Sequence, residues 1–381
     1  MTVRFRPPVS SAQGPLPHPA APLTLGFLSS HNPFDRRTFS GTAHFAVQAL
    51  SRRSGLRLKV LGPHRPLGPL DLWRERLLGP RAIEPDPQLI DFAGIDVVVG
   101  LVASTLLDKL DPAASPPFVH VTDATPAFLR EFYGWEIPPE ADAIEGRVAR
   151  RAAAVCYSSD AIARRATRDL GSGITTRTIP FGINFETLPG TCPVKPPAAP
   201  LRLLFVCTDW DRKGGDMVLN ILVGLRDREI PTELTVVGRC PKHLRHLPGL
   251  RHIRYLDKNR PDECARLSAL YAESHLLLLP TRADCTPMVV AEALAHGTPV
   301  LARATGGMRS LMAAGCGALM AADAEAEEWI ASVVMLGLDQ GRFTASSKAA
   351  FDHAHSTLTW DTWARQIEVV CRDTLIRRQA A

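Results

Sequence analysis

The stretch from Leu276 to Arg309 constrains the fold more than any other part of this chain of 381 residues. Leu276–Leu279 is a wholly apolar run ended by Pro280, which is typical of a strand buried on both faces of a parallel sheet. Pro299–Ala302 has the same character, and residues 288–295 between the two runs have the length and composition of a short helix. The stretch therefore predicts a strand–helix–strand unit, the building block of α/β domains.

Signals at both ends of the predicted helix agree with this unit. Thr286 and Pro287 supply an N-cap residue followed by proline at the first helical position, and Gly297 stands where a left-handed C-terminal cap belongs. Asp284 precedes the helix, and Glu292 lies about 9 Å along it at about 1.5 Å per residue. Because ligands bind at the carboxyl ends of the strands in such sheets, both carboxylates are candidate ligand contacts.

The rest of the chain repeats the alternation of strand and helix. The predicted strands of the first half are 23–29, 56–61, 96–100, 117–121 and 154–158, with helices at 42–51, 146–152 and 159–170. In the second half, strands are expected at 201–206, 234–238 and 253–256, a helix from Met217 and another across 262–273. Such alternation indicates an α/β fold with two Rossmann-like, doubly wound parallel sheets.

Composition shifts divide the chain into segments. Residues 1–22 are rich in Pro, Ser and Ala and are expected to be disordered. Residues 23–185 form a first Rossmann-like domain, and the proline-rich stretch 186–200, which lacks apolar periodicity, forms a linker. Residues 201–357 form a second Rossmann-like domain. Residues 358–381 form a terminal helix, expected to pack back on the first domain, and a cleft between the domains would be the ligand site.

Charge and cysteine usage exclude several classes of protein. The net charge of +5 is too small to indicate nucleic-acid binding, and a solvated surface is favoured over contact with an anionic membrane. The eight cysteines show neither a C-x-x-C pair nor a cluster, so neither zinc nor disulfides are predicted. With no apolar run of about 18 residues and no signal peptide, we expect a cytoplasmic protein, with peripheral contact at the inner face of the membrane as the alternative.

Several motifs, in their order along the chain, together resemble one enzyme family. The chain is similar to GT-B glycosyltransferases of the retaining family-4 type. The motifs that carry the resemblance are Ser40-Gly41-Thr42, the turn Pro180-Phe181-Gly182-Ile183-Asn184, the stretch Arg212-Lys213-Gly214-Gly215-Asp216, Pro280-Thr281, Asp284-x7-Glu292, Gly297-Thr298-Pro299-Val300 and Gly306-Gly307. They span about residues 23–371 and are densest from 201 to 311.

The resemblance implies a nucleoside diphosphate sugar as donor, and the residue types agree. Arg212 and Lys213 would supply fixed positive charge to the diphosphate, although an exposed basic pair is the alternative. Glu292 is assigned to the ribose hydroxyls, since its helix is apolar nearly all round and an unpaired buried carboxylate is costly. Asp284 is assigned to the transferred sugar. Further donor contacts are assigned to Thr286, Pro287 and the backbone N–H groups of Thr305, Gly306 and Gly307.

The first domain offers fewer candidates. Gly41 marks a loop-to-helix junction whose N–H groups could face an anion, and an ordinary helix start is equally supported. Asp123 follows a buried strand and is a candidate catalytic contact to sugar or acceptor, but it could equally cap a helix at 125–132. His120 could be only a core histidine. Thr122 stands where the family often has histidine, so that contact cannot be carried over.

Other departures from the family pattern point to a divergent branch. Asp284 replaces a glutamate that is longer by one methylene, and Cys207-Thr208-Asp209 replaces a Gly-Arg-Leu triplet. Ser310 stands where an acidic residue is frequent. The Asp284 change could alter the sugar that is recognised.

The implied reaction is transfer of a sugar, with retained configuration, to a hydroxyl of a glycan or lipid-linked acceptor. No cofactor is expected beyond the donor itself, and no metal, because the fold that the resemblance implies usually works without one. Three alternatives stay open: a nucleotide-sugar epimerase on the same fold, a pyridoxal-phosphate phosphorylase, and a catalytically silent subunit of a glycan-assembly complex. The retention of Arg212, Lys213 and Glu292 argues against the silent subunit.

Overall fold

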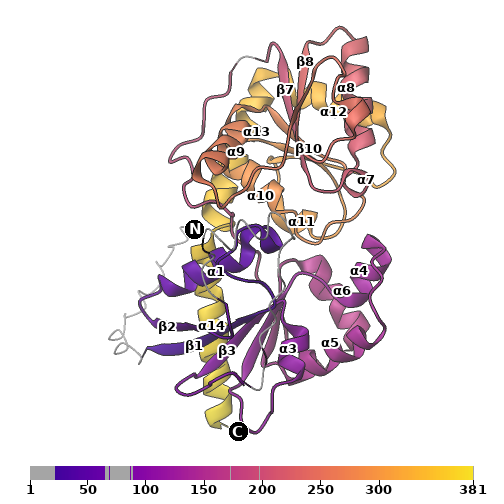
Figure 1. Cartoon of the computed structure of the whole chain (residues 1–381). Helices are drawn as coiled ribbons and strands as arrows, with labels where there is room; N and C mark the ends of the chain where they lie inside the picture. Colours follow the sequence, from indigo (N-terminus) through magenta and orange to yellow (C-terminus); the bar gives the residue numbers. More distant parts are fainter. Residues whose placement is uncertain are drawn as a thin grey trace, which may run out of the picture.

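Two α/β domains stacked end to end make up the computed structural model, which describes residues 22–64, 68, 86, 89–171, 173–196 and 198–380 (Figure 1). Each domain contains a six-stranded sheet, and all recorded strand pairs are parallel. Of the predicted tail, only Pro22 lies within the described residues. No helix among the described residues is both long and apolar enough to cross a membrane.

The first sheet has the strand order β2-β1-β3-β4-β5-β6. Its strands are β1 (Leu23–Ser29), β2 (Leu56–Val60), β3 (Val97–Leu101), β4 (Phe118–Thr122), β5 (Ala154–Tyr157) and β6 (Thr176–Thr178). The helical elements of this half are η1 (Thr38–Gly41), α1 (Thr42–Ser51), α3 (Ser104–Asp108), α4 (Pro126–Tyr133), α5 (Glu140–Arg151) and α6 (Asp160–Leu170). β1 and β3 to β5 are almost wholly buried, as their apolar sequences predict.

The second sheet has the order β12-β11-β10-β7-β8-β9. Its strands are β7 (Leu201–Cys207), β8 (Thr232–Gly238), β9 (Leu250–Ile253), β10 (Leu276–Leu279), β11 (Val300–Arg303) and β12 (Gly317–Met320). The helical elements are α7 (Trp210–Lys213), α8 (Gly215–Asp227), η3 (Lys242–Leu244), α9 (Pro261–Glu273), α10 (Met288–Ala295), α11 (Met308–Leu311), α12 (Ala326–Gly337) and α13 (Gln340–Thr357). The order reverses between β7 and β10, and ligands of doubly wound sheets bind at such a reversal.

The predicted doubly wound architecture is confirmed, and the strand predicted at 253–256 was misplaced. The strand is β9, Leu250–Ile253, because Gly249 turns the chain with φ of +79° and its carbonyl accepts the N–H of Leu234. Pairing with β8 therefore begins at Leu250. Of the apolar residues that suggested the later strand, Ile253 ends β9, and Tyr255 and Leu256 belong to the loop that follows.

Arg212 and Lys213 lie on a helix rather than in the loop that the sequence suggested. α7 makes a single turn, and the side chain of Asp209 caps it by accepting the N–H of Arg212 at 3.2 Å. Gly214 ends it in a left-handed conformation, and a Cβ there would lie 2.3 Å from the carbonyl oxygen of Pro280. This close approach sets α7 directly against the carboxyl end of β10.

The last helix, α14 (Trp360–Ala380), returns to the first domain and runs along it beside α1 (Figure 1). Trp363, Ile367 and Cys371 are fully buried in a core that they share with β1, β3 and α1. At its start, the indole N–H of Trp360 donates to the side-chain oxygen of Asn184 at 3.0 Å. Gly182 permits this contact, because a Cβ there would lie 2.3 Å from the Trp360 backbone nitrogen.

We therefore expect Gly182→Ala to destabilise the protein by about 1 to 3 kcal/mol, the usual range for overfilling a packed site. Thermal unfolding followed by circular dichroism measures the change. Gly190→Ala is the matched control in the following segment, because nothing lies within 4 Å of its added Cβ. Equal melting temperatures for both variants would contradict the assigned role of Gly182.

Candidate active site

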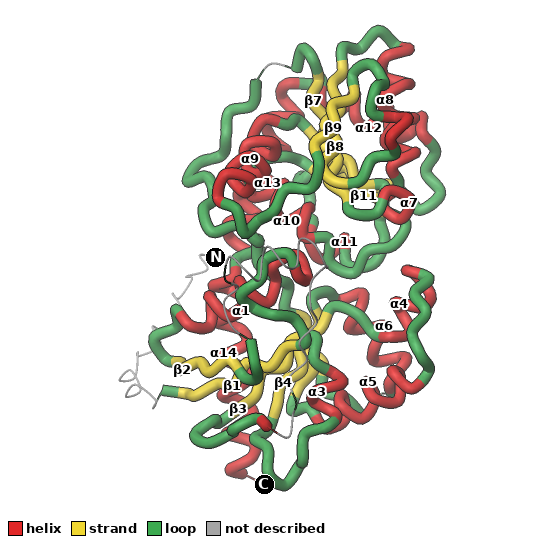
Figure 2. The backbone as a smooth tube through the Cα atoms, in the orientation of Figure 1, coloured by secondary structure: helices red, strands yellow, loops and turns green. Residues whose placement is uncertain are grey.

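A cavity of about 290 Å³ lies between the two domains, at the carboxyl ends of the strands. Figure 2 shows α10 and α11 of the second domain facing α1 and the loops of the first. The cavity is lined by the following residues predicted from the sequence: Asp123, Arg212, Lys213, Asp284, Thr286, Pro287 and Glu292. Gly41, Thr305, Gly306 and Gly307 are not among the lining residues.

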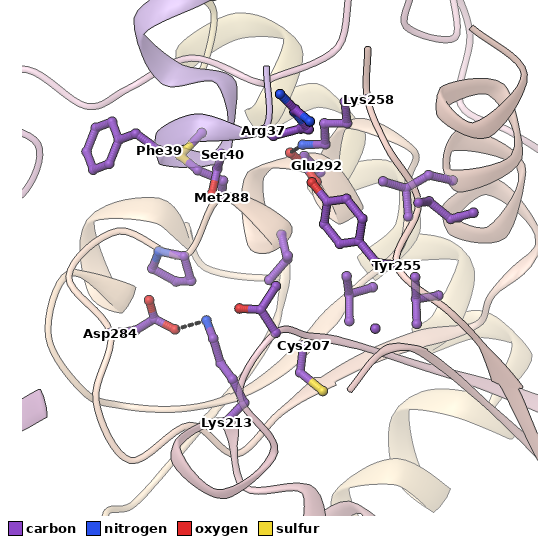
Figure 3. Close-up of a pocket in the computed structure, with 18 of the residues that line it drawn as sticks. Arg37, Phe39, Ser40, Cys207, Lys213, Tyr255, Lys258, Asp284, Met288 and Glu292 are labelled. Carbon is purple, nitrogen blue, oxygen red and sulfur yellow. Dashed lines mark hydrogen bonds and ion pairs between the residues drawn. The ribbon is translucent and has the colours of Figure 1, made fainter. Parts of the chain in front are cut away.

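Lys213 and Asp284 lie together at one end of the cavity (Figure 3). The two side chains form an ion pair, and both residues are buried, at 8% and 6% exposure. Arg212 adds a second cation, with its Nη1 3.9 Å from an Asp284 carboxylate oxygen and donating to the Ala283 carbonyl at 2.8 Å. The alternative of an exposed basic pair is therefore excluded, and the arrangement can hold an anionic group beside a hydrogen-bond acceptor.

Glu292 lines the same cavity from α10 and is only 1% exposed. Its carboxylate forms an ion pair with Lys258 (Figure 3) and accepts the hydroxyl of Tyr271 at 3.0 Å. A buried charge requires such partners. Lys258 lies in the loop after β9 and was missed by the sequence argument; the only signal for it was the need of Glu292 for a cation.

Asp123 lies at the end of β4 and lines the cavity from the first domain. It does not cap α4, because the side chain of Thr125 accepts the N–H of Phe128 at 3.2 Å and serves as the cap. Burial, with the negative charge of Asp284 as a smaller cause, raises the pKa of Asp123 to about 7. The two carboxylates thus lie near one another across the cavity.

The loop after β1 approaches the cavity in an uncommon conformation. Phe39, Ser40 and Gly41 have successive φ angles of 47°, 56° and 88°, a left-handed run that costs energy at the two non-glycine residues. Asn184 holds the loop, because its side-chain amide donates to the Ser40 carbonyl at 2.9 Å. Phe39 and Ser40 therefore reach the cavity, while Gly41 is the N-cap residue of α1 and does not line it.

The double glycine after β11 packs against the loop that carries Asp284. A Cβ on Gly306 would lie 1.7 Å from the Asp284 carbonyl oxygen, and one on Gly307 would lie 2.0 Å from that of Cys285. The N–H of Gly307 donates to the Asp284 carbonyl at 3.3 Å, and that of Thr305 donates to Arg303 at 2.8 Å. Close packing alone accounts for both glycines, and their assignment to the donor stays a prediction.

The sequence predicted Thr286 as the N-cap residue of α10. The helix begins at Met288, and its N-cap residue is Pro287, one position later. Pro287 takes the place before the helix, and its carbonyl accepts the N–H of Val290 at 2.9 Å. The Thr286 hydroxyl is thereby released from capping and lies 2.5 Å from that of Ser158 in the first domain. Thr286 thus helps to hold the two domains together.

A second contact between the domains joins the loop after β1 to the loop after β9. The side-chain amide of Asn259 donates to the Asp35 carboxylate at 2.9 Å, while its oxygen accepts the N–H of Arg36 at 3.0 Å. Arg36 also donates to the Lys258 carbonyl at 3.3 Å. Ser40, from the motif Ser40-Gly41-Thr42, lines the cavity; the lining residues that the sequence argument did not find include Arg36, Arg37, Phe39, Tyr133, Tyr255 and Lys258. Tyr133 ends α4, and most of the others depend on loops without a recognisable pattern.

Comparison with known proteins places this geometry in context. Residues 200–339 match the family model described as glycosyl transferases group 1. The D-inositol 3-phosphate glycosyltransferase of Corynebacterium aurimucosum is 31% identical over 175 residues, covering 43% of this chain and 41% of that protein. The chain thus spans about two fifths of the length of the first of its curated relatives.

Solved structures extend the likeness to the whole fold. The sucrose-phosphate synthase of Thermosynechococcus elongatus aligns with a TM-score of 0.66 at 14% identity, over 93% of this chain and 100% of that one. The HepE protein of Anabaena in complex with UDP gives 0.66 at 15% identity, over 92% and 100%. The protein has the GT-B fold of two-domain glycosyltransferases. In this GT-B chain the cavity lies between the domains, and the segment that matches the family model supplies Arg212, Lys213, Asp284 and Glu292.

The raised pKa of Asp123 gives a testable dependence of stability on pH. Between its ordinary value of 3.8 and about 7, the folded protein binds the Asp123 proton more tightly than the unfolded chain does. Ionisation of Asp123 therefore lowers the free energy of unfolding as the pH rises through this window. We expect Asp123→Asn to be more stable than wild type at pH 8, with the difference shrinking towards pH 4. Urea unfolding of both proteins across this range measures it, and parallel pH profiles would contradict the assignment.

Proposed function

We propose that the protein is a retaining glycosyltransferase that moves a sugar from a nucleoside diphosphate sugar to a hydroxyl of a glycan or lipid-linked acceptor. The observation that carries this proposal is the single cavity lined by Arg212, Lys213 and Asp284 together with Glu292. These residues lie in the segment that matches the glycosyl transferases group 1 model. Cations and carboxylates along one cavity suit a ligand with phosphates and several hydroxyls.

Each group has a role that its surroundings support. Arg212 and Lys213 would neutralise the charge that develops on the diphosphate as the bond to the sugar breaks. Glu292, on the helix that faces the nucleotide end, would accept the ribose hydroxyls in exchange for its present partner Lys258. Asp284 and Asp123 would orient the transferred sugar and the acceptor.

A donor screen tests the proposal directly. Purified protein is incubated with UDP-, GDP- and ADP-sugars, with and without simple glycoside acceptors, and release of the nucleoside diphosphate is followed. We expect slow hydrolysis of the donors that carry one of the three nucleotide bases. The matching nucleoside diphosphate should also stabilise the protein in thermal-shift measurements. Absence of both for every base refutes the proposal, and appearance of an epimerised donor without release of nucleotide would assign an epimerase instead.

Separate substitutions distinguish the two ends of the cavity. We expect Glu292→Gln to raise the donor KM about tenfold to a hundredfold, the range for losing a charged hydrogen-bond partner. We expect Lys213→Ala to lower kcat by about a hundredfold or more, because its charge acts on the leaving group. Steady-state kinetics with the donor found in the screen measures both parameters.

Lys348→Ala is the matched control, since Lys348 pairs with Asp352 on the exposed surface of α13. Its kinetics should equal those of the wild type. Circular dichroism establishes that the Lys213 variant is folded. Wild-type kinetics in both cavity variants would refute the site assignment.

Catalysis is further proposed to need no divalent ion, because Arg212 and Lys213 supply the positive charge for the diphosphate. Among the described residues, no group of three or more His, Cys, Asp or Glu side chains could hold a metal ion. We expect the rate of donor turnover to be unchanged by EDTA. Loss of turnover in EDTA that manganese restores would show that the protein uses a metal.

A further inference from the structure

Tyr133 is a cavity residue from the first domain whose hydroxyl and ring face also contact the second domain. It is the last residue of α4, and Gly134 follows it in a left-handed conformation that ends the helix. The Tyr133 ring lines the cavity together with Asp123 and Asp284. Neither the motifs of the sequence nor the roles assigned above account for this side chain.

Two contacts join Tyr133 to the proposed donor site. Its hydroxyl oxygen accepts the backbone N–H of Cys285 at 2.8 Å, in the residue that follows Asp284. The face of its ring lies under the guanidinium of Arg212, with 4.8 Å between the guanidinium carbon and the ring centroid. One side chain of the first domain therefore adds a contact both to the loop that carries Asp284 and to the guanidinium of Arg212, beside the second-domain contacts of Arg212 with Asp209 and Ala283.

The Tyr133 ring is itself held by other aromatic residues. Trp135 packs edge-on against it at 5.1 Å, and Phe128 of α4 lies 6.3 Å away in a tilted arrangement. Phe128 is buried in the core between α4, β5 and α6. The position of Tyr133 is therefore set by its own domain, and its contacts with Arg212 and Cys285 form only when that domain lies against the second.

The Tyr133 hydroxyl is a neutral group that can both accept and donate a hydrogen bond. Burial and the nearby negative charges of Asp284 and Asp123 raise the pKa of Tyr133 well above its ordinary value, so the phenol keeps its proton. A phenol that accepts the Cys285 N–H still has its O–H to donate. The thiol of Cys285 also lies beside it, but a thiol is a weak acceptor.

We propose that Tyr133 is a positioning residue for glycosyl transfer, which orders Arg212 and the Asp284 loop only when the two domains are closed on each other. This inference rests on the proposed function. It couples closure of the cleft to the geometry of the leaving-group site, so that the diphosphate meets an ordered guanidinium only when bulk water is excluded.

Two substitutions separate the two contacts. Tyr133→Phe removes the hydrogen bond to Cys285 and keeps the ring under Arg212. We expect kcat for transfer to fall about tenfold, with little change in the donor KM, because the donor binds mainly to the second domain. The share of donor lost to hydrolysis should rise, since closure is weakened. Tyr133→Leu also removes the ring from Arg212, so the donor KM should rise about threefold or more.

Tyr157→Phe is the matched control, because the hydroxyl of Tyr157 is buried on β5 without a hydrogen-bond partner among the described residues and lies outside the cavity lining. Its kinetics should equal those of the wild type.

Small-angle scattering supplies a measurement independent of turnover: Tyr133→Phe should have a larger radius of gyration than wild type and Tyr157→Phe. Wild-type kcat and hydrolysis share in Tyr133→Phe would overturn the proposal, and so would equal radii. If wild type itself turns over no donor, the proposed function fails, and the scattering comparison still decides whether Tyr133 holds the domains closed.

Discussion

Two buried ion pairs, Lys213 with Asp284 and Lys258 with Glu292, determine what the cavity can do. A carboxylate removed from water must keep a cation or several hydrogen bonds, and the loss of one partner from a buried pair is strongly destabilising. Each lysine is the main cation beside its carboxylate, supplemented by Arg212 at 3.9 Å from Asp284 and by the Tyr271 hydroxyl at 3.0 Å from Glu292. An entering ligand must offer each of these groups a contact as good as the one it displaces, which favours ligands that combine anions with hydroxyls.

The two pairs are supported differently. Lys213 is fixed by its own helix, since α7 is capped by Asp209 and packed against Pro280 at Gly214. Lys258 lies in a loop, and the first domain holds that loop through the contacts of Arg36 with Lys258 and Asn259. Lys213 is thus positioned within the second domain, although Tyr133 of the first domain contacts the loop of its partner Asp284, whereas the position of Lys258 itself depends on how the domains meet. Contact between the domains is therefore part of the electrostatics of the cavity.

The sequence predicted the fold well where periodicity and buried strands decide it. The unit from β10 to β11, the double winding and the burial of Glu292 follow from apolar runs and end signals. Arg212 and Lys213 were found by their motif, but the sequence placed them in a loop, because a single helical turn leaves no periodic pattern. Lys258, Tyr133 and Phe39 could not be found, since their roles arise from contacts between segments more than 30 residues apart. For Asp123 the sequence left two interpretations equal, and only the cap supplied by Thr125 separated them.

The backbone of the loop that carries Asp284 is held independently of the Asp284 side chain. The backbone of this loop is fixed on several sides: by the Arg212 contact at the Ala283 carbonyl, the close approach of Gly306, and the Tyr133 hydroxyl at the Cys285 N–H. The position of the Asp284 α-carbon is therefore independent of what its carboxylate binds. With the backbone fixed, the carboxylate of an aspartate lies closer to the backbone than that of a glutamate would. A glutamate at this position would have to project further into the cavity or displace Lys213. The aspartate thus leaves more space for a ligand than a glutamate would, at the same charge.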